Sequence, residues 1–361
     1  MRARTVLAAS AASVLALVLP AAGPATASPA DDPIVSGLAG PLQFDVSTNG
    51  SIYVAQAFAG VITRVRPNGT TRNVVTEEGV SGVATKRSQI VYTVNIDPSE
   101  GETTPSVELL KRRFPNGKIR ILANLGRFER RNNPDQGQRY GLRRLHGSCK
   151  QELQEAGLPP EVLAALLPYT GQVDSNPYAV ANAPEGGWYV ADAGANAILH
   201  VSPKKRVTVM HVARPQKVTV TAEFAESFGL PDCVVGLPLA FEPVPTDVEV
   251  NRLGYLIFSL LPGGPEDDTL GGRGAVYRLS PGDFEWTRLA DGFVGATNVA
   301  TARGGRIYVA ELFGNRVSLI RKGVVTTVSD EVLNPAAVEF ANGTLYASIN
   351  AFTDGQIVTL P

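Results

Sequence analysis

Six oxygen-bearing side chains stand at related places in a repeated sequence pattern. Tyr-Val-Ala-Asp ends at Asp192 and Tyr-Val-Ala-Glu ends at Glu311, and an asparagine follows each acidic residue four positions later. The other four stand before or at the start of apolar, strand-like segments and are Asn176, Asp247, Asn298 and Asn334. Carboxylate and amide oxygens are the ligands of Ca²⁺, in sets of about six to eight. If the fold gathers these residues, they predict a metal site with Ca²⁺ as the cofactor.

A purely local role is the alternative for four of these residues. Asp192 and Glu311 can accept backbone N–H groups from the bend that follows each of them, as acidic side chains commonly do in turns. Asn176 and Asn334 each precede a proline, and their role can be only to set the entry into the strand that follows. Local turns explain the remaining two, Asp247 and Asn298, least.

The elements that must position these residues form a repeat. Each copy reads as a glycine turn, an apolar strand, a short bend and a second alternating strand, and the copies are 50–65, 186–201, 304–320 and, more loosely, 343–358. Such hairpins, recurring at about 40–50 residues with four strands at a time, are typical of β-propeller blades. We therefore predict an all-β fold, a six-bladed β-propeller of four-stranded blades. The blades are expected at 43–75, 82–122, 177–212, 246–289, 297–328 and 336–360.

The last predicted blade runs out of chain after three strands. A spare apolar segment around Ile34 and Val35 precedes the first blade. We expect it to supply the missing fourth strand and to close the ring, because closure removes an exposed sheet edge.

Two long insertions interrupt the repeat, at 123–173 and 213–244. The first begins polar and rich in arginine, and then predicts two short helices, one opening at Ser148 or Cys149 and one at Pro159-Pro160. Both insertions join the last strand of one blade to the first strand of the next, so they emerge on one face together with the loops 97–105 and 260–273. Long loops on a rigid scaffold usually carry binding surfaces, and function is expected on this face.

Residues 1–27 have the pattern of a secretory signal: Arg2 and Arg4 precede an apolar run, and small residues flank a cleavage site near Ala27. We expect a secreted bacterial protein whose mature part, 28–361, is a single domain without a membrane segment. The two cysteines, Cys149 and Cys233, most simply pair as a disulfide in an oxidising compartment, and two buried free thiols are the alternative. The bridge would join the two insertions.

Charge and motif content exclude several classes. The chain has 33 basic and 34 acidic residues, which gives no reason to expect a nucleic-acid partner. The local basic cluster is interpreted as a solvated face and comprises Arg127, Arg130, Arg131, Arg139, Arg143 and Arg144. Of the three histidines, His146, His200 and His211, only His146 falls on the insertion face, so a zinc centre or histidine-based hydrolase has no evident ligand set. No serine-hydrolase, nucleotide-binding or zinc-protease motif is present.

The Tyr-Val-Ala-Asp and Tyr-Val-Ala-Glu hairpins resemble NHL-type propeller repeats. The order of features is similar to that of the ScyD/ScyE family of secreted bacterial propellers: an export segment, the opening IVSGLAGPLQFDVSTNGSIYVAQ, a helical insertion after blade two, then SNPYAVANAPEGGWYVADAGANAILHVSP. The resemblance covers essentially all of the mature chain. The resemblance implies the fold and export. Members of that family have no agreed biochemical activity, so it implies none for this chain.

Without a visible catalytic constellation, we predict a non-catalytic extracellular binding or scaffold protein. Its partner would be an extracellular protein or small molecule, and we expect a monomer. A Ca²⁺-dependent hydrolase such as a lactonase, with Asp247 essential, is the first alternative. A lyase resembling streptogramin lyases is the second, and it would depend on His146.

Overall fold

The computed structural model describes residues 32–86, 88–97, 106–265, 269–280, 282 and 284–361. Within these ranges the chain forms seven sheets of four antiparallel strands, with few and short helices. Strands dominate because β-branched and apolar residues alternate with polar ones over short segments bounded by glycine and asparagine turns. The predicted signal segment 1–27, residues 98–105 of the loop 97–105 and residues 266–268 of the loop 260–273 lie outside the described residues.

Six of the sheets correspond to the predicted repeat, with strands paired in chain order. Sheet 1 contains β2 (Pro41–Val46), β3 (Ile52–Gln56), β4 (Val61–Val65) and β5 (Thr71–Thr76). Sheet 2 contains β6 (Val80–Lys86), β7 (Gln89–Ile96), β8 (Val107–Arg113) and β9 (Ile119–Asn124). Sheet 3 contains β12 (Pro177–Asn182), β13 (Trp188–Asp192), β14 (Ala197–Val201) and β15 (Val207–Val212).

The remaining three follow the same order. Sheet 4 contains β18 (Pro245–Val250), β19 (Leu256–Leu260), β20 (Gly274–Leu279) and β21 (Trp286–Phe293). Sheet 5 contains β22 (Ala296–Ala302), β23 (Arg306–Glu311), β24 (Arg316–Arg321) and β25 (Val324–Ser329). Sheet 6 contains β26 (Ala337–Ala341), β27 (Thr344–Ile349), β28 (Gly355–Leu360) and, from the other end of the chain, β1 (Val35–Leu38).

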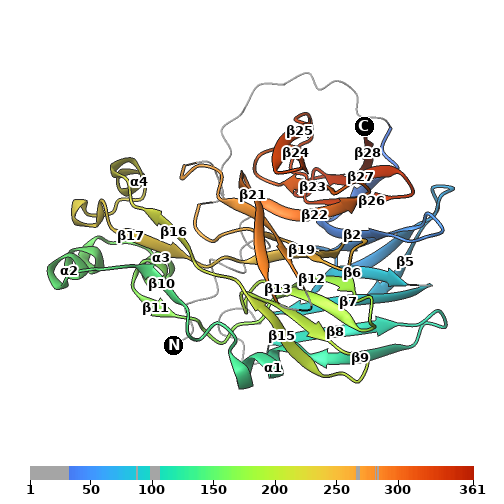
Figure 1. The fold of residues 1–361 in the computed structure, drawn as a ribbon, viewed down its shortest axis with the longest axis horizontal. Coiled ribbons are helices and arrows are strands. Elements are labelled where there is room, and N and C mark those ends of the chain that lie inside the picture. Colours follow the sequence, from blue (N-terminus) through green and yellow to red (C-terminus); the bar gives the residue numbers. More distant parts are fainter. Residues whose placement is uncertain (1–31, 87, 98–105, 266–268, 281, 283) are drawn as a thin grey trace.

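The first strands of these sheets form a closed cycle of contacts. Strand β2 contacts β6, β6 contacts β12, β12 contacts β18, β18 contacts β22, β22 contacts β26, and β26 contacts β2 (Figure 1). Apolar side chains from facing sheets fill the space between neighbours: Tyr53 and Ile62 of sheet 1, for example, pack with Tyr92 and Val94 of sheet 2. Each sheet therefore has its first strand at the centre of the ring, and the apolar cores lie between neighbouring sheets.

The N-terminal strand takes the place expected for it. Val35 pairs with Ile357 and Leu38 pairs with Gly355 in an antiparallel register, and the Ile34 N–H donates to the Ile357 carbonyl at 2.8 Å. The two ends of the described chain thus complete one sheet, which removes the free edge that β28 would otherwise expose.

The seventh sheet belongs to the insertions. Its strands are ordered β11 (Tyr169–Thr170), β10 (Arg139–Leu142), β17 (Pro238–Phe241) and β16 (Gln216–Thr219), so each insertion supplies two. Helices α2 (Gly147–Glu155), α3 (Pro160–Leu166) and α4 (Ala222–Ser227), with the short 3₁₀ helix η1 (Asp232–Val234), lie around this sheet at one side of the molecule (Figure 1). We call this assembly, residues 139–170 and 216–241, the lobe. It has its own core, which includes Leu142, Leu153, Phe224 and Leu239.

The lobe partly corrects the prediction of a helical insertion. Helices α2 and α3 begin where expected, at Gly147 and Pro160. Helix α1 (Leu125–Asn132), which lies in the arginine-rich stretch, was not predicted from the sequence, and neither was the seventh sheet. The lobe strands are only two to four residues long, the strands paired within each insertion are far apart in sequence, and the central pair, β10 and β17, joins the two insertions, so no local hairpin pattern marks them.

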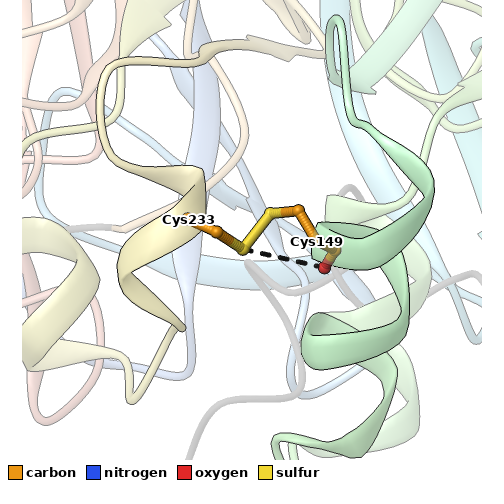
Figure 2. Close-up of a disulfide and its surroundings, with 2 residues drawn as sticks. All are labelled: Cys149 and Cys233. Atoms are coloured by element: carbon orange, nitrogen blue, oxygen red, sulfur yellow. Dashed lines mark hydrogen bonds between the residues drawn. A yellow bond between two sulfur atoms is a disulfide. The ribbon is translucent and has the colours of Figure 1, made fainter.

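The predicted disulfide is confirmed. Cys149 at the start of α2 is bonded to Cys233 in η1, 84 residues apart in sequence (Figure 2). Cys149 is buried in the lobe core, so the bridge fastens the two insertions at the centre of their shared packing. None of the helices that the structure describes is long and apolar enough to span a bilayer.

Candidate functional site

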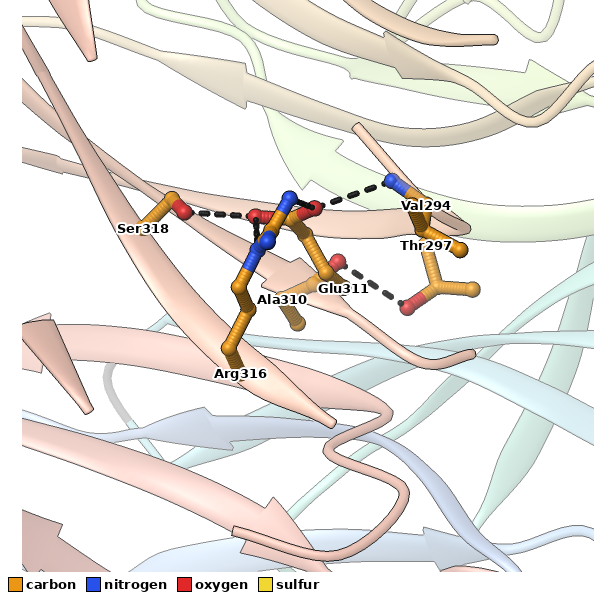
Figure 3. Close-up of polar contacts among 6 residues, drawn as sticks. All are labelled: Val294, Thr297, Ala310, Glu311, Arg316 and Ser318. Carbon is orange, nitrogen blue, oxygen red and sulfur yellow. Dashed lines mark hydrogen bonds and ion pairs between the residues drawn. The ribbon is translucent and has the colours of Figure 1, made fainter. Parts of the chain in front are cut away.

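The bend between the second and third strands of sheet 5 carries Glu311, a fully buried carboxylate with a complete set of partners (Figure 3). Arg316 donates from Nε and Nη2 to its two oxygens, each at 2.8 Å, and Ser318 Oγ also donates to it. The backbone N–H of Val294 donates to Oε2 at 2.9 Å. The paired carboxylate raises the pKa of Arg316, which stabilises the charged pair. We call this group the fifth-sheet corner.

The same bend in sheet 3 carries Asp192, which caps its own turn as predicted. Glu311 does not, because the backbone N–H that it accepts comes from Val294 and not from the bend after it. Its oxygens accept the N–H of Asn176 at 2.7 Å, the N–H of Ala195 at 3.2 Å and the Ser175 hydroxyl at 2.7 Å. The position that matches Arg316 is Ala197, five residues after the carboxylate in both sheets. Asp192 is 1% exposed, so it is a buried carboxylate that has hydrogen bonds but no cationic partner in its own sheet.

The space above Asp192 is filled by the insertions. Asn196 Nδ2 donates to Asp135 Oδ2 at 3.0 Å and to Glu242 Oε2 at 3.1 Å, and its own Oδ1 accepts the Val244 N–H at 3.1 Å. Tyr140 donates to Asp135 Oδ2 at 2.8 Å, and Tyr169 donates to Glu242 Oε1 at 2.8 Å. One buried asparagine therefore ties the bend of sheet 3 to both insertions.

Two glycines make this close approach feasible. A methyl group added to Gly171 would lie 2.2 Å from Asp135 Oδ1, and one added to Gly194 would lie 2.9 Å from Asp174 Cγ. Any larger residue would displace these carboxyl groups. The third-sheet corner, as we call it, comprises Asp192 and Asn196 of the bend with Glu129, Asp135, Asp174 and Glu242 from the insertions.

The carboxyl groups of the third-sheet corner all have raised pKa values. Burial, followed by the charges of Asp192, Asp135 and Asp174, raises the pKa of Glu129 to about 9. Burial and the charge of Asp192 raise the pKa of Asp174 to about 7, and burial raises that of Asp192 itself to about 6. Removing carboxylates from water disfavours their charged form, and like charges nearby add to the effect.

Asp247 and Asn298 occupy equivalent positions in the first strands of sheets 4 and 5, each just after a β-bulge. Asp247 Oδ2 accepts the N–H of Val299 at 2.9 Å, and Asn298 Oδ1 accepts the N–H of Val338 at 2.8 Å. Each side chain therefore joins its own sheet to the next one around the ring.

Gln43 occupies the same position in sheet 1 and was not predicted. Its Oε1 accepts Nδ2 of Asn298 at 3.0 Å, and its Nε2 donates to the Thr246 carbonyl at 3.3 Å. Because these partners belong to sheets 4 and 5, Gln43 spans the middle of the ring. Its period-two spacing with Asp45, like that of Asp247 with Glu249, is the signal that could have identified it.

Four acidic residues of the first strands, Asp45, Asp247, Glu249 and Glu339, form a second acidic group, which we call the first-strand carboxyls. Asp45 accepts the N–H of Thr85 in the next sheet. Burial raises the pKa of all four, that of Asp247 to about 7. The charges of Asp247 and Asp45 also raise the pKa of Glu249.

The six predicted metal ligands are distributed over several networks. Asn176 accepts Nδ2 of Asn95 at 3.0 Å and donates its N–H to Asp192, whereas Asn334 donates its N–H to Asn315 and its Nδ2 to the Leu312 carbonyl. In the part of the chain that the structure describes, no three His, Cys, Asp or Glu side chains are grouped so as to hold a metal ion. A metal held by the predicted ring of oxygens stays a prediction.

The histidines lie in the lobe and in outer strands. His146 is exposed at the start of α2. His200 lies in β14 against Tyr189, and His211 lies in β15 between Phe258 and Trp286. Burial lowers the pKa of His211 to about 4, so it is neutral near pH 7.

Solved structures identify the fold. A PQQ-bound aldose sugar dehydrogenase from Streptomyces coelicolor is 13% identical, with a TM-score of 0.52 over 94% of this chain and 99% of that one. A candidate gluconolactonase is 12% identical, with a TM-score of 0.50 over 92% of this chain and 94% of that one. A luciferin-regenerating enzyme is also 12% identical, with a TM-score of 0.52 over 91% of this chain and 92% of that one. The chain is a β-propeller. At such identities the likeness shows the fold alone. No protein-family model matches the sequence, and no curated protein does.

Sequence reasoning found the propeller's bend residues but missed the acidic residues above them. Glu129 and Asp135 lie among the arginines of the predicted solvated face, and Asp174 and Glu242 lie near the ends of the insertions. Arg127, Arg130 and Arg131 are exposed on α1, as expected for solvated groups, while Glu129 on the same helix is buried. Glu129 differs from these arginines only in lying on the buried face of α1, a helix that was not predicted.

Proposed function

We propose that the protein is an exported, six-bladed β-propeller of the ScyD/ScyE type that binds an extracellular partner through its lobe. The closed cycle of six first strands and the pairing of β1 with β28 support the blade count. The disulfide supports export, since such bonds persist in oxidising compartments.

The observation that carries the binding role is the lobe itself. Two insertions, 84 residues apart at their cysteines, share a sheet, an apolar core and a covalent bridge. The ring sheets close without them, so this ordered structure is not needed to complete the propeller. Rigid, elaborated loops on one face of a scaffold are where recognition surfaces usually lie.

The lobe also presents apolar side chains to solvent. Phe228 and Val235 are each 39% exposed and come from the same short segment that contains the end of α4 and η1. Exposed large apolar groups close together on a rigid element favour a protein partner or an apolar ligand, because burying them would release their contact with water.

The test compares two faces. The oxidised protein would be used to capture partners from the medium of the producing cells, with Phe228→Ser/Val235→Ser as the lobe variant. Leu253→Ser is the matched control, because Leu253 is 81% exposed in the turn between β18 and β19, a turn that carries no insertion. Loss of a partner with the lobe variant but not with Leu253→Ser is expected. Equal capture by all three proteins would refute binding through the lobe.

A hydrolase is the second candidate, favoured by one observation. Asp247 is buried at a first strand and has a pKa raised to about 7, which suits a general base. A lactone and ester screen would reveal such an activity. Hydrolysis abolished by Asp247→Asn in a variant that melts normally, and kept by the lobe variant, would favour this candidate over the binding role.

A further inference from the structure

The third-sheet corner contains buried oxygens without donors. Glu129 is 1% exposed, and neither of its carboxyl oxygens has a hydrogen-bond partner. Asp135 is also 1% exposed, and its Oδ1 is unpartnered, as is the amide oxygen of Asn133. The backbone N–H of Asp174 approaches the Glu129 carboxyl and lowers its pKa slightly, but it does not reach hydrogen-bonding geometry. A buried polar oxygen without a hydrogen-bond partner is costly, so each of these oxygens calls for a partner.

These oxygens belong to one short stretch of chain. Glu129 lies in the last turns of α1, and Asn133 caps that helix, donating its backbone N–H to the Glu129 carbonyl at 2.8 Å. Asn133 Nδ2 donates to the Gly171 carbonyl at 3.1 Å, and the α-carbon of Gly171 packs directly against Asp135 Oδ1. The unpartnered oxygens thus come from the end of α1 and the turn after it, where Gly171 approaches both Asn133 and Asp135.

The corner also lacks positive charge. Among the described residues, no Lys, Arg or His side chain forms an ion pair with Glu129, Asp135, Asp174, Asp192 or Glu242. Arg130, the residue after Glu129, pairs instead with Glu108, its Nη1 lying 3.6 Å from Glu108 Oε2. The charged groups that shift the pKa of Glu129 are Asp192, Asp135 and Asp174, and those that shift the pKa of Asp174 also include Asp97 and Glu108; none of them is cationic.

The fifth-sheet corner shows what the third lacks. There, the guanidinium of Arg316 neutralises Glu311. In sheet 3 the matching residue is Ala197, which is fully buried, and the insertions bring further carboxyl groups instead. A bound cation would supply the missing charge and would partner the unpartnered oxygens.

We propose that the third-sheet corner binds one divalent cation of the Ca²⁺ class, held by the carboxylates of Glu129 and Asp135 and the amide oxygen of Asn133. Ca²⁺ accepts six to eight oxygens in irregular geometry, including amides, carbonyls and water, whereas Mg²⁺ requires a near-octahedral set. Two carboxylates with neutral oxygens suffice for such an ion, so a third acidic ligand is not required. The site is distinct from the ring of ligands expected at Asp247 and Asn298.

The cation would connect three parts of the molecule. Glu129 belongs to α1 after sheet 2, and Asp135 is tied through Asn196 to the bend of sheet 3. Asp135 also accepts the hydroxyl of Tyr140, a lobe strand residue. A cation at this place would therefore hold the lobe on the propeller, and its removal would loosen the lobe before the ring.

The test uses the full mature chain with its disulfide intact, dialysed against EGTA and titrated with Ca²⁺ by calorimetry. One ion per chain and a rise in melting temperature are expected, since a ligand of the native state alone stabilises it. Tb³⁺ serves as a second probe: it takes Ca²⁺ ligands, and Tyr140, bonded to Asp135, should sensitise its emission.

Glu129→Gln and Asp135→Asn keep the side-chain shape and remove the charge. Each should weaken Ca²⁺ binding at least tenfold and reduce Tb³⁺ emission, while Glu129→Gln in EGTA should melt at or above the wild-type temperature. Glu339→Gln, which removes one of the first-strand carboxyls, is the matched control and should bind Ca²⁺ as the wild type does. Absence of Ca²⁺ and Tb³⁺ binding by the wild type, unchanged binding by both corner variants, or loss of binding in Glu339→Gln would overturn the proposal.

Discussion

The bends of the third and fifth sheets have related sequences, ADAGANAI and AELFGNRV, and they bury a carboxylate in the same place. They neutralise it in different ways. In the fifth, Arg316 lies five residues after Glu311 and its half-exposed side chain completes the pair within one hairpin. In the third, an alanine stands there, and Asp192 is covered by the insertions and their own acidic residues.

The two bends differ in one residue that decides how their carboxylate is neutralised: Arg316 in sheet 5 and Ala197 in sheet 3. A long, charged arginine neutralises the buried carboxylate of sheet 5 from within the same hairpin while its own side chain stays partly exposed. The smaller alanine of sheet 3 leaves room for the insertions to pack over the bend. The buried charge of Asp192 can then be compensated only by groups that are distant in the sequence. The insertions therefore cover the one of these two bends that lacks its own counter-charge.

The largest expected effect comes from separating the lobe. Cys149→Ser/Cys233→Ser removes a bridge that closes a long loop, and the expected loss is about 4 kcal/mol of unfolding free energy. Urea denaturation measures the loss, and hydrogen exchange locates it. Amides of the third-sheet corner should exchange faster while those of the fifth keep their protection. Faster exchange in both corners would show that the lobe supports the whole ring.

The next effect tests the fifth-sheet corner. Arg316→Met leaves Glu311 buried without a cation, and the expected cost is about 3 kcal/mol, at the lower end for a buried pair because the arginine is partly exposed. Urea unfolding of the single variant and of Arg316→Met/Glu311→Gln provides the measurement. The double variant should recover most of the loss. If it does not, the arginine acts through packing and the comparison of charges fails.

A smaller effect separates the two bend asparagines. Asn196 and Asn315 both have a positive φ, 51° and 50°, so replacement by alanine strains both backbones alike. Asn196→Ala also removes donors from Asp135 and Glu242, whereas Asn315→Ala removes one acceptor of a backbone N–H. Asn196→Ala should cost about 2 kcal/mol more in a thermal or urea melt. Equal losses would mean that Asn196 does not hold the insertions.

The smallest effect is a pH dependence in the metal-free protein. The folded pKa of Glu129, about 9, lies above its unfolded value near 4.5, so the folded state binds the extra proton. Stability from this group is complete below about pH 4.5 and is lost as pH rises towards 9. Between pH 7 and 8 in EGTA, the wild type should lose up to about 1.4 kcal/mol more than Glu129→Gln. A matching slope in the variant would show that Glu129 is not the titrating group.

Local sequence determined the hairpins of the ring. Turn glycines, alternating apolar strands and the Tyr-Val-Ala-Asp pattern are features of neighbouring residues, and they predicted the strands of all six ring sheets to within a few residues. They also predicted the turn-capping role of Asp192, because the acceptor and the N–H donor of its bend, Ala195, lie only three residues apart. The spare segment at Ile34 followed from counting strands, and its pairing with Ile357 agrees.

Tertiary structure alone decided the lobe and the acidic group beneath it. Strands β10 and β17 are about 100 residues apart, and each is too short to be recognised from a sequence pattern. Their pairing is stabilised by a shared core and a disulfide. Likewise, Glu129 reads in the sequence as one more polar residue among arginines. Its burial depends on how α1 packs against sheet 2 and the bend of sheet 3, and burial is what converts an ordinary carboxylate into a candidate ligand.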